Sequence, residues 1–324
     1  MNIKLAFISI LTDFQRYGLL ILYSVIIGLC AESLVSCSKW DEMDSLIIKD
    51  YPNRQEDFSL WQLDAFFEEV QMGYILRCDD GAIIVIDGGG TSTAPILKGY
   101  LQQLGGKVNT WIVTHPHTDH MNALLEIIND RTILIDRILH VPLDEAWVLQ
   151  NEATNFDSCK RYMDILQTSP VLKIDVEVGS NYSLGQGVEM EVLGGRNPSI
   201  TQNAINNSSM VFKIRSKTKS VLFTGDLGDL GGIALLITIA SERLKSDYVQ
   251  MAHHGQGGVN KAFYTATNPK YALWPTPKWL WNNQPEGKSA NSGNGKTFIV
   301  RQWMDEIEIE RNFVSGLEGT IQID

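Results

Sequence analysis

Three histidines and an aspartate lie within six consecutive residues, in the run from His115 to His120. The chain holds six histidines in total, so half of them are in this run. Neutral imidazole and carboxylate groups are ligands for Zn, Mn and Fe ions, and a catalytic site keeps one coordination position open for water. Water on such an ion ionises near neutral pH and supplies hydroxide. The run therefore predicts a divalent metal site with hydrolytic chemistry.

The segments on either side of this run predict the turn that positions it. Residues 110–114 are apolar and strand-like, and residues 120–128 have the apolar periodicity of a helix. A strand-to-helix turn at the edge of a sheet points its side chains into a cleft. Strand-like and helix-like segments alternate from residue 82 to residue 252, which is typical of an α/β fold. At 324 residues and 44% hydrophobic, the chain can bury one large core.

The pattern His-x-His-x-Asp-His at 115–120 resembles the signature of the metallo-β-lactamase-fold hydrolases. Three further segments follow the order that this family uses. Residues 82–90 form an apolar strand that ends in Asp87 and a glycine turn, residues 220–226 form a strand that ends in Asp226, and residues 248–255 end in a histidine pair. The resemblance spans residues 57 to 275 and implies a four-layer αββα sandwich.

The resemblance also implies the ligands of two metal positions. The first, here called position A, would have Asp119, His120, Asp226 and one of the pair His253 and His254. The second, position B, would have His115, His117 and the shared Asp226. Asp119 would hold a metal and orient the nucleophile, and Asp87 would support the loop that carries the histidines. The implied cofactor is one or two divalent ions, Zn or alternatively Mn.

Many members of the family carry another histidine between the first cluster and the bridging aspartate. The only histidine in that interval is His140, which lies in a strand-like segment, and we interpret it as structural. Position B therefore lacks its usual third histidine. We predict that it binds its ion more weakly than position A, so that two tightly held ions after extensive dialysis would contradict this interpretation.

Residues 206–212, 224–226 and 253–255 are similar to segments of the metallo-β-lactamase-like domain of the ComEC/Rec2 DNA-uptake proteins. In those proteins an Asn-Asn-Ser segment occupies the place of the missing histidine, which implies that Asn206 or Asn207 faces the metals. The resemblance favours hydrolysis of a phosphodiester or related phosphoester by a metal-bound hydroxide. The alternatives are a lactone, β-lactam or thioester hydrolase, and a catalytically weak binding protein of the same fold.

The formal net charge is −11, and the charges of residues 1–36 sum to zero, so the remainder carries all of it. This balance disfavours long nucleic acid as a partner, because non-specific binding to it relies on basic surface. It agrees better with a small molecule or a short phosphodiester. Basic residues alternate from Lys213 to Lys219, and we interpret them as a solvated face, with a local basic groove as the alternative.

The amino-terminal segment predicts export. Residues 17–31 are an uncharged apolar run of signal-peptide length, and Lys4 and Arg16 precede it. Residues 34–37 resemble the lipobox of bacterial lipoproteins of the Bacteroidota type, in which Cys37 is lipidated. We predict a signal peptide at 1–36, a tether at 37–56 and a hydrolase domain at 57–324, anchored to a membrane in the cell envelope. An uncleaved anchor and a start at Met43 are the alternatives.

Overall fold

The structure, a computed structural model, describes residues 45–293 and 295–323. The predicted signal peptide and Cys37 lie outside the described residues. The compact unit begins at Leu46, ahead of the predicted boundary at residue 57. Leu46 is buried, and its backbone exchanges two hydrogen bonds with the side chain of Gln103. None of the helices in the described residues is long and apolar enough to cross a membrane.

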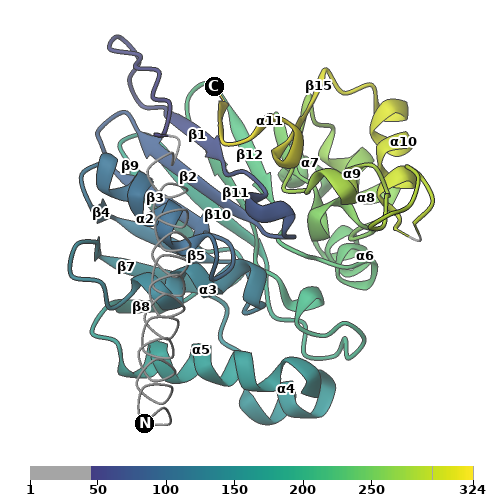
Figure 1. Cartoon of the computed structure of the whole chain (residues 1–324), viewed down its shortest axis with the longest axis horizontal. Coiled ribbons are helices and arrows are strands. Elements are labelled where there is room, and N and C mark those ends of the chain that lie inside the picture. Colours follow the sequence, from purple (N-terminus) through teal and green to yellow (C-terminus); the bar gives the residue numbers. More distant parts are fainter. Residues whose placement is uncertain (1–44, 294, 324) are drawn as a thin grey trace, which may run out of the picture. The chain divides into compact units, whose positions relative to one another are not determined.

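Two mixed sheets of seven strands each form the middle of the described part (Figure 1). The first sheet has the order β16-β1-β2-β3-β5-β7-β8. Its strands are β1 (Phe58–Gln62), β2 (Gly73–Cys78), β3 (Ile83–Asp87), β5 (Thr110–Val113), β7 (Arg137–His140), β8 (Leu172–Asp175) and β16 (Ile321–Ile323). A separate two-stranded sheet pairs β4 (Lys107–Val108) with β6 (Leu134–Ile135).

The second sheet has the order β15-β14-β13-β12-β11-β10-β9. Its strands are β9 (Asn181–Gly185), β10 (Val188–Gly194), β11 (Val211–Arg215), β12 (Ser220–Phe223), β13 (Tyr248–Gln250), β14 (Tyr271–Trp274) and β15 (Arg311–Val314). In both sheets a hairpin of antiparallel strands adjoins a run of parallel strands.

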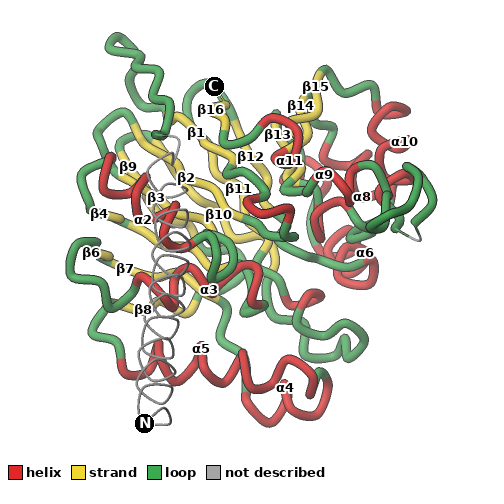
Figure 2. The backbone as a smooth tube through the Cα atoms, in the orientation of Figure 1, coloured by secondary structure: helices red, strands yellow, loops and turns green. Residues whose placement is uncertain are grey.

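Helices cover the outer face of each sheet, as the red and yellow segments of Figure 2 show. The first sheet packs against α2 (Ala94–Gln103), α3 (Thr118–Ile127) and α5 (Phe156–Thr168). The second packs against α6 (Asp229–Thr238), α7 (Ser241–Leu244), α8 (Lys261–Thr267) and α10 (Thr297–Ile307). The remaining short helices are α4 (Glu145–Asn151), α9 (Lys278–Trp281) and α11 (Ser315–Glu318). Single 3-10 turns are η1 (Phe66–Glu68), η2 (Ala153–Asn155), η3 (Asn206–Ser208) and η4 (Ala252–Gly255). The predicted four-layer αββα sandwich is confirmed.

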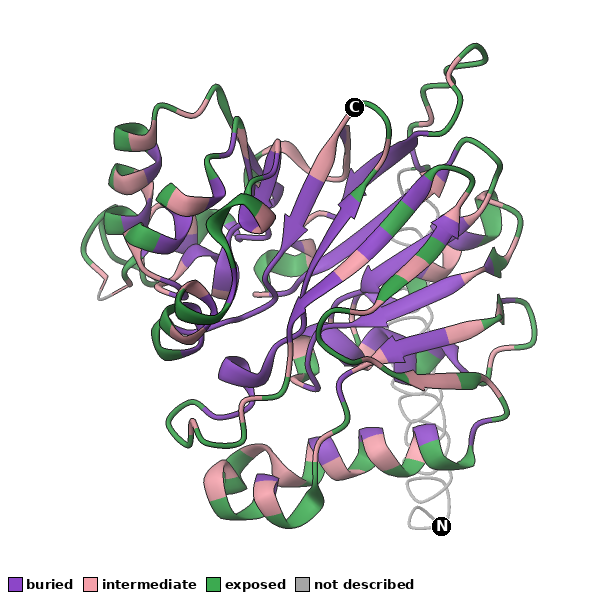
Figure 3. Ribbon diagram, turned by 180° about the vertical axis from the view of Figure 1, so that it is seen from behind, coloured by how far each residue is buried: buried purple, intermediate pink, exposed green. Residues whose placement is uncertain are grey.

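Strand β3 shows why this sequence forms the layers. All five of its residues are buried, because both faces of the sheet are covered. Successive side chains of a strand point to opposite faces. Ile83 and Val85 therefore pack with the helices, whereas Ile84 and Ile86 pack between the two sheets. Figure 3 shows similar burial along the central strands, with exposed residues in the turns and on the outer sides of the helices. The apolar run that predicted a buried strand therefore contributes side chains to two cores, one under the helices and one between the sheets.

Candidate metal centre

The candidate ligands come from turns at the carboxyl ends of parallel strands in both sheets. The run 115–120 leaves β5 and opens α3, beside the end of β3 at Asp87. Asp226 follows β12, and the histidine pair 253–254 follows β13, which is parallel to β12. Each sheet therefore contributes side chains to one cluster. This placement is the one that the strand-to-turn pattern predicted.

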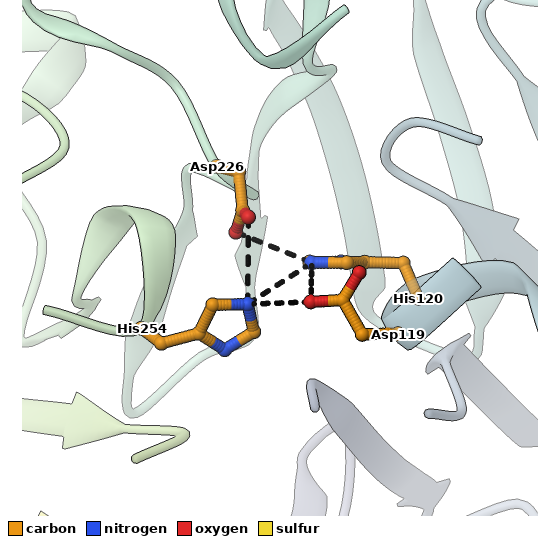
Figure 4. A group of neighbouring side chains, drawn as sticks. All are labelled: Asp119, His120, Asp226 and His254. Atoms are coloured by element: carbon orange, nitrogen blue, oxygen red, sulfur yellow. Dashed lines mark hydrogen bonds and ion pairs between the residues drawn. The ribbon is translucent and has the colours of Figure 1, made fainter. Parts of the chain in front are cut away.

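Four of the predicted ligands meet in one compact group (Figure 4). Their ligand atoms all lie within 4.8 Å of one another; the group consists of Asp119, His120, Asp226 and His254. The Asp119 Oδ2 atom lies 3.1 Å from His254 Nε2 and 3.7 Å from His120 Nε2. Asp226 Oδ1 lies 3.2 Å from His120 Nε2, and its Oδ2 lies 3.4 Å from His254 Nε2. This group corresponds to position A, with His254 rather than His253 as its second histidine.

These separations fit an ion. Ligand nitrogens and oxygens about 2.0–2.2 Å from a tetrahedral zinc lie roughly 3.3–3.6 Å from one another. The interatomic distances within the group bracket that range. Two carboxylates and two imidazoles are also the donor chemistry that such an ion accepts. The residues of position A therefore suit a divalent cation.

Contacts on the far side of each ring decide which nitrogen faces the cluster. The Nδ1 atom of His120 lies 2.7 Å from Asp87 Oδ2, and the Nδ1 atom of His254 lies 3.0 Å from the carbonyl oxygen of Pro275. A carbonyl or carboxylate oxygen only accepts, so each Nδ1 carries the hydrogen. In the neutral form that binds a metal, the Nε2 atom of each ring therefore has its lone pair toward the cluster. Such partners of the opposite nitrogen are typical of metal-binding histidines.

Asp87 lies behind the metal loop, where the resemblance implied that it would support the histidines. Its carboxylate is fully buried and accepts from the Thr114 backbone N–H at 2.7 Å and the Thr114 hydroxyl at 2.8 Å, in addition to His120. The strand β5, the start of the metal loop and the first ring are thus fixed to one side chain. The glycine turn that follows Asp87 packs closely as well, because a Cβ on Gly88 would lie 2.9 Å from Leu97.

The ligand atoms predicted for position B lie farther apart than those of position A. His115 is buried, its Nε2 atom has no hydrogen-bond partner, and Asp226 Oδ2 lies 3.9 Å away. An unpartnered buried nitrogen is costly unless something binds it. The Nε2 atom of His253 lies 3.8 Å from the same carboxylate oxygen. The ring of His117 lies beside that of His115, with their centroids 4.7 Å apart. Among the described residues only position A brings its ligand atoms within 4.8 Å of one another, so the ligands predicted for position B do not form a comparably compact group.

The charges of the cluster favour a bound cation. Burial alone would raise the pKa of the Asp226 carboxyl, but His254 and His120 hold it well below its usual range. Burial opposes the charged form of His254, yet Asp226 and Asp119 raise its pKa to about 9. The carboxylates thus draw positive charge into a buried site. Burial lowers the pKa of His115 well below its usual value, so this ring is neutral, the form that binds metals.

The two asparagines, one of which was predicted to face the metals, differ in their hydrogen bonds. The Asn207 side chain donates to the carbonyl oxygens of Gln202 and Asn203, and its Oδ1 accepts from the Gly231 backbone N–H at 2.8 Å. These bonds place its amide at the start of α6 rather than among the histidines. Asn206 differs, because its buried Oδ1 atom has no hydrogen-bond partner.

The residues that we interpreted as structural lie in structural contacts. His140 Nε2 is 3.1 Å from Asp175 Oδ1, and its ring packs against Tyr162. The basic row was interpreted as a solvated face, which agrees with the exposed Arg215 but is wrong for Lys213, because that side chain is buried. Lys213 donates to the backbone carbonyls of Arg243 and Lys245, and Arg215 pairs with Glu189. The described part therefore offers no basic groove built from these two residues.

Sequence reasoning missed Glu152, which contacts the metal loop. Its Oε1 atom lies 2.9 Å from His117 Nε2, and its Oε2 atom accepts from the Ile205 backbone N–H at 2.8 Å. Glu152 belongs to no motif and precedes the 205–209 segment by more than fifty residues. The Thr114 hydroxyl and the Pro275 carbonyl were missed for the same reason. A single residue that becomes a neighbour only through tertiary packing leaves no local pattern.

The turn that carries the histidine pair has an unusual backbone. His253, His254 and Gly255 have φ values of 51°, 54° and 74°, in the left-handed region that side chains with a Cβ rarely adopt. Two strained residues in succession cost free energy, and such strain persists mainly at functional sites. The turn directs the Nε2 atoms of both rings to within 4 Å of Asp226 Oδ2.

Gly255 is required by this turn, and we predict that Gly255→Ala destabilises the protein by about 2–4 kcal/mol. A Cβ there would lie 2.3 Å from the indole ring of Trp274, at a φ that alanine disfavours. Urea denaturation of the metal-free protein measures the change. Gly287→Ala is the control, because Gly287 also has a positive φ but has no atom within 4 Å of its built Cβ. Equal losses in the two variants would contradict the steric argument.

The comparisons with known proteins concern the family and the fold. The family model of the metallo-beta-lactamase superfamily matches residues 69–274. The metallo-beta-lactamase fold protein YhfI from Bacillus subtilis is 14% identical over 82% of this chain and 100% of its own, with a TM-score of 0.48. The metallo hydrolase Igni18 from Ignicoccus hospitalis is 13% identical over 83% and 99%, with a TM-score of 0.47. No curated protein sequence matches the chain.

A longer solved structure shares the fold. A variant of CmlA, a β-hydroxylase of Streptomyces venezuelae, is 16% identical over 84% of this chain and 54% of its own, with a TM-score of 0.50. At this identity the likeness concerns the architecture of two sheets and flanking helices.

Proposed function

The chain belongs to the metallo-β-lactamase superfamily, and from this premise we propose that it is a metal-dependent hydrolase of phosphodiesters or related phosphoesters. One observation carries the hydrolase proposal. The ligand atoms of Asp119, His120, Asp226 and His254 converge, and the two rings are held from behind with Nε2 toward the group. These prepared ligands support metal binding, and the partly exposed Asp119 among them supports catalysis, because a catalytic site keeps a position open to water and substrate.

Divalent cations bound at positions A and B, Zn or Mn, would activate water and neutralise negative charge that develops on the substrate. The chain's own residues supply the orientation. The side chains of Asp119 and His253 are each 30% exposed, whereas those of His120, Asp226 and His254 are almost fully buried. Substrate therefore approaches along Asp119, whose carboxylate we assign to orienting the attacking water.

The phosphoester preference rests on the resemblance of the 206–212, 224–226 and 253–255 segments to the ComEC/Rec2-like domains. The net charge of −11 supports a small or short substrate rather than long nucleic acid. Lys213 agrees with that limit, because it is buried and donates to backbone carbonyl oxygens instead of facing a substrate.

A substrate panel tests the proposal. Bis-p-nitrophenyl phosphate, nitrocefin and an acyl lactone are each assayed with Zn and with Mn, and we expect turnover of the phosphodiester. Turnover of nitrocefin or the lactone alone would replace the phosphoester assignment by a carboxylic one. Asp119→Ala should lose all turnover while it keeps its fold, which circular dichroism monitors. No turnover in any condition would favour a binding protein.

We also propose that the chain is a lipoprotein of the cell envelope, anchored to a membrane through Cys37. The lipobox-like residues 34–37 after an apolar run support this. Mass spectrometry of the native amino terminus tests it. A lipidated Cys37 is the expected result, and a chain that keeps residues 1–36 or begins at Met43 would overturn it.

A further inference from the structure

Glu152 joins three parts of the molecule that are distant in the sequence. It ends α4, and its side chain is 13% exposed. Its Oε1 atom lies 2.9 Å from His117 Nε2 and accepts from the Asn155 amide at 2.8 Å, while Oε2 accepts from the Ile205 backbone N–H at 2.8 Å. The carboxylate is thus held by its neighbours on both oxygens, and it reaches a ligand of position B.

Three histidines of the cluster have the same orientation, with Nδ1 bonded behind the ring. His120 and His254 use Nδ1 for a partner behind the ring, and the Nδ1 atom of His115 lies 3.1 Å from the Thr114 hydroxyl. In all three rings Nε2 is the atom toward the cluster. His117 is the exception, because its Nε2 atom is the one that faces a carboxylate.

This exception fixes the tautomer of His117. A carboxylate only accepts hydrogen bonds, so Nε2 of His117 carries the hydrogen and Nδ1 carries the lone pair. Carboxylates behind a metal-binding ring set its tautomer and orientation and strengthen it as a ligand. The Asn155 amide nitrogen also lies 3.3 Å from His117 Nε2 and has a second hydrogen that it could donate there, but a lone pair on Nε2 would then face the Glu152 carboxylate at 2.9 Å.

We propose that Glu152 is a positioning residue for position B: it holds His117 as an Nδ1 ligand and joins that ligand to α4 and to the 205–207 turn. The proposal rests on the proposed metal-dependent function and deepens it. The affinity of position B is then governed by a side chain that makes no contact with position A.

The tautomer can be measured without any metal. In the metal-free protein labelled with 15N-histidine, long-range proton–nitrogen correlation spectra report which ring nitrogen carries the hydrogen, and the chain has only six histidines to assign. We expect His117 protonated on Nε2 in the wild type and a shift toward mixed tautomers in Glu152→Ala. A wild-type His117 protonated on Nδ1 would overturn the proposal.

Metal binding gives the second readout. Stepwise Zn and Co titrations with a competing chelator give one dissociation constant for each ion. We expect Glu152→Ala to weaken the second ion by about 10–100-fold and leave the first unchanged. Glu152→Gln keeps an accepting oxygen, so we expect a smaller loss of affinity for the second ion. This variant replaces Glu152→Ala in the experiment if the alanine variant does not fold. Glu145→Ala is the matched control, since Glu145 is exposed on the same helix and pairs only with Lys160.

A double-variant cycle separates positioning from general damage. In a His117→Ala background, Glu152→Ala should have no further effect on either ion. Four results would each overturn the proposal. In Glu152→Ala, both ions could bind as in the wild type or both could bind equally more weakly. Glu152→Ala could have the same effect in the absence of His117, or the wild type could bind only one ion. Failure of the proposed function looks different: both ions bind as expected, yet no substrate of the panel is turned over.

Discussion

Asp226→Ala is expected to abolish tight binding at position A, to weaken the already weaker binding at position B, and to lower turnover by roughly a thousandfold or more. One carboxylate serves both positions, with Oδ1 toward His120 and Oδ2 toward His115 and His254. Its removal takes a ligand from each ion and leaves imidazoles without a counter-charge. A loss of about 4 kcal/mol of transition-state stabilisation corresponds to that factor.

Two measurements check this expectation. Elemental analysis after dialysis gives the ions per chain, and the phosphodiester assay gives turnover. Asp229→Ala is the matched control, because Asp229 lies three residues later, is exposed, and contacts only the Asn260 side chain. Retention of one tightly bound ion in Asp226→Ala would show that one position forms without the shared carboxylate.

Asp87→Ala is the second large change, and it acts without touching an ion. The substitution leaves three buried donors without an acceptor: the Thr114 N–H, the Thr114 hydroxyl and the His120 ring. We expect the free energy of unfolding of the metal-free protein to fall by about 3 kcal/mol or more. We also expect the ion at position A to bind about 10–100-fold more weakly, because removal of the partner behind a metal-binding histidine typically lowers metal affinity by that factor.

The asparagine variant refines this result. Asp87 has a φ of 56°, which asparagine tolerates, so Asp87→Asn keeps the turn while it removes the charge. We expect it to be more stable than Asp87→Ala but still weaker in metal affinity than the wild type. Urea denaturation and chelator competition provide the two values. The exposed Asp136, which pairs with Lys107 on the surface, offers a control in Asp136→Ala, and a similar loss there would contradict the argument.

Much of the site could be predicted because its parts are local. The run from His115 to His120 combines ligand-type residues with a strand before it and a helix after it, and these patterns need only a few neighbouring residues. The same holds for Asp87 and Asp226, each at the end of a buried strand. The unbroken apolar run of β3 predicted a buried strand, but one large core was expected, whereas β3 packs between two separate cores.

The parts that could not be predicted depend on packing between distant segments. Nothing around Glu152 distinguishes it from the other acidic residues, and its link to His117 exists only once α4 lies against the metal loop. The role of Asn207 was wrongly placed for a related reason: its type suited a ligand, but the start of α6 needed its amide. A residue type limits what a side chain can do, and the tertiary neighbours select among those uses.

The division of ligands between the sheets has a consequence for the folded state. Asp119 and His120 extend from the first sheet, and Asp226 and His254 from the second, so neither half of the sandwich can complete position A alone. An ion held there acts as a non-covalent cross-link between the two halves. Its binding free energy adds to that of folding and grows with the logarithm of the free metal concentration. We therefore expect the resistance of this protein to heat and proteases to rise with the free metal concentration around it.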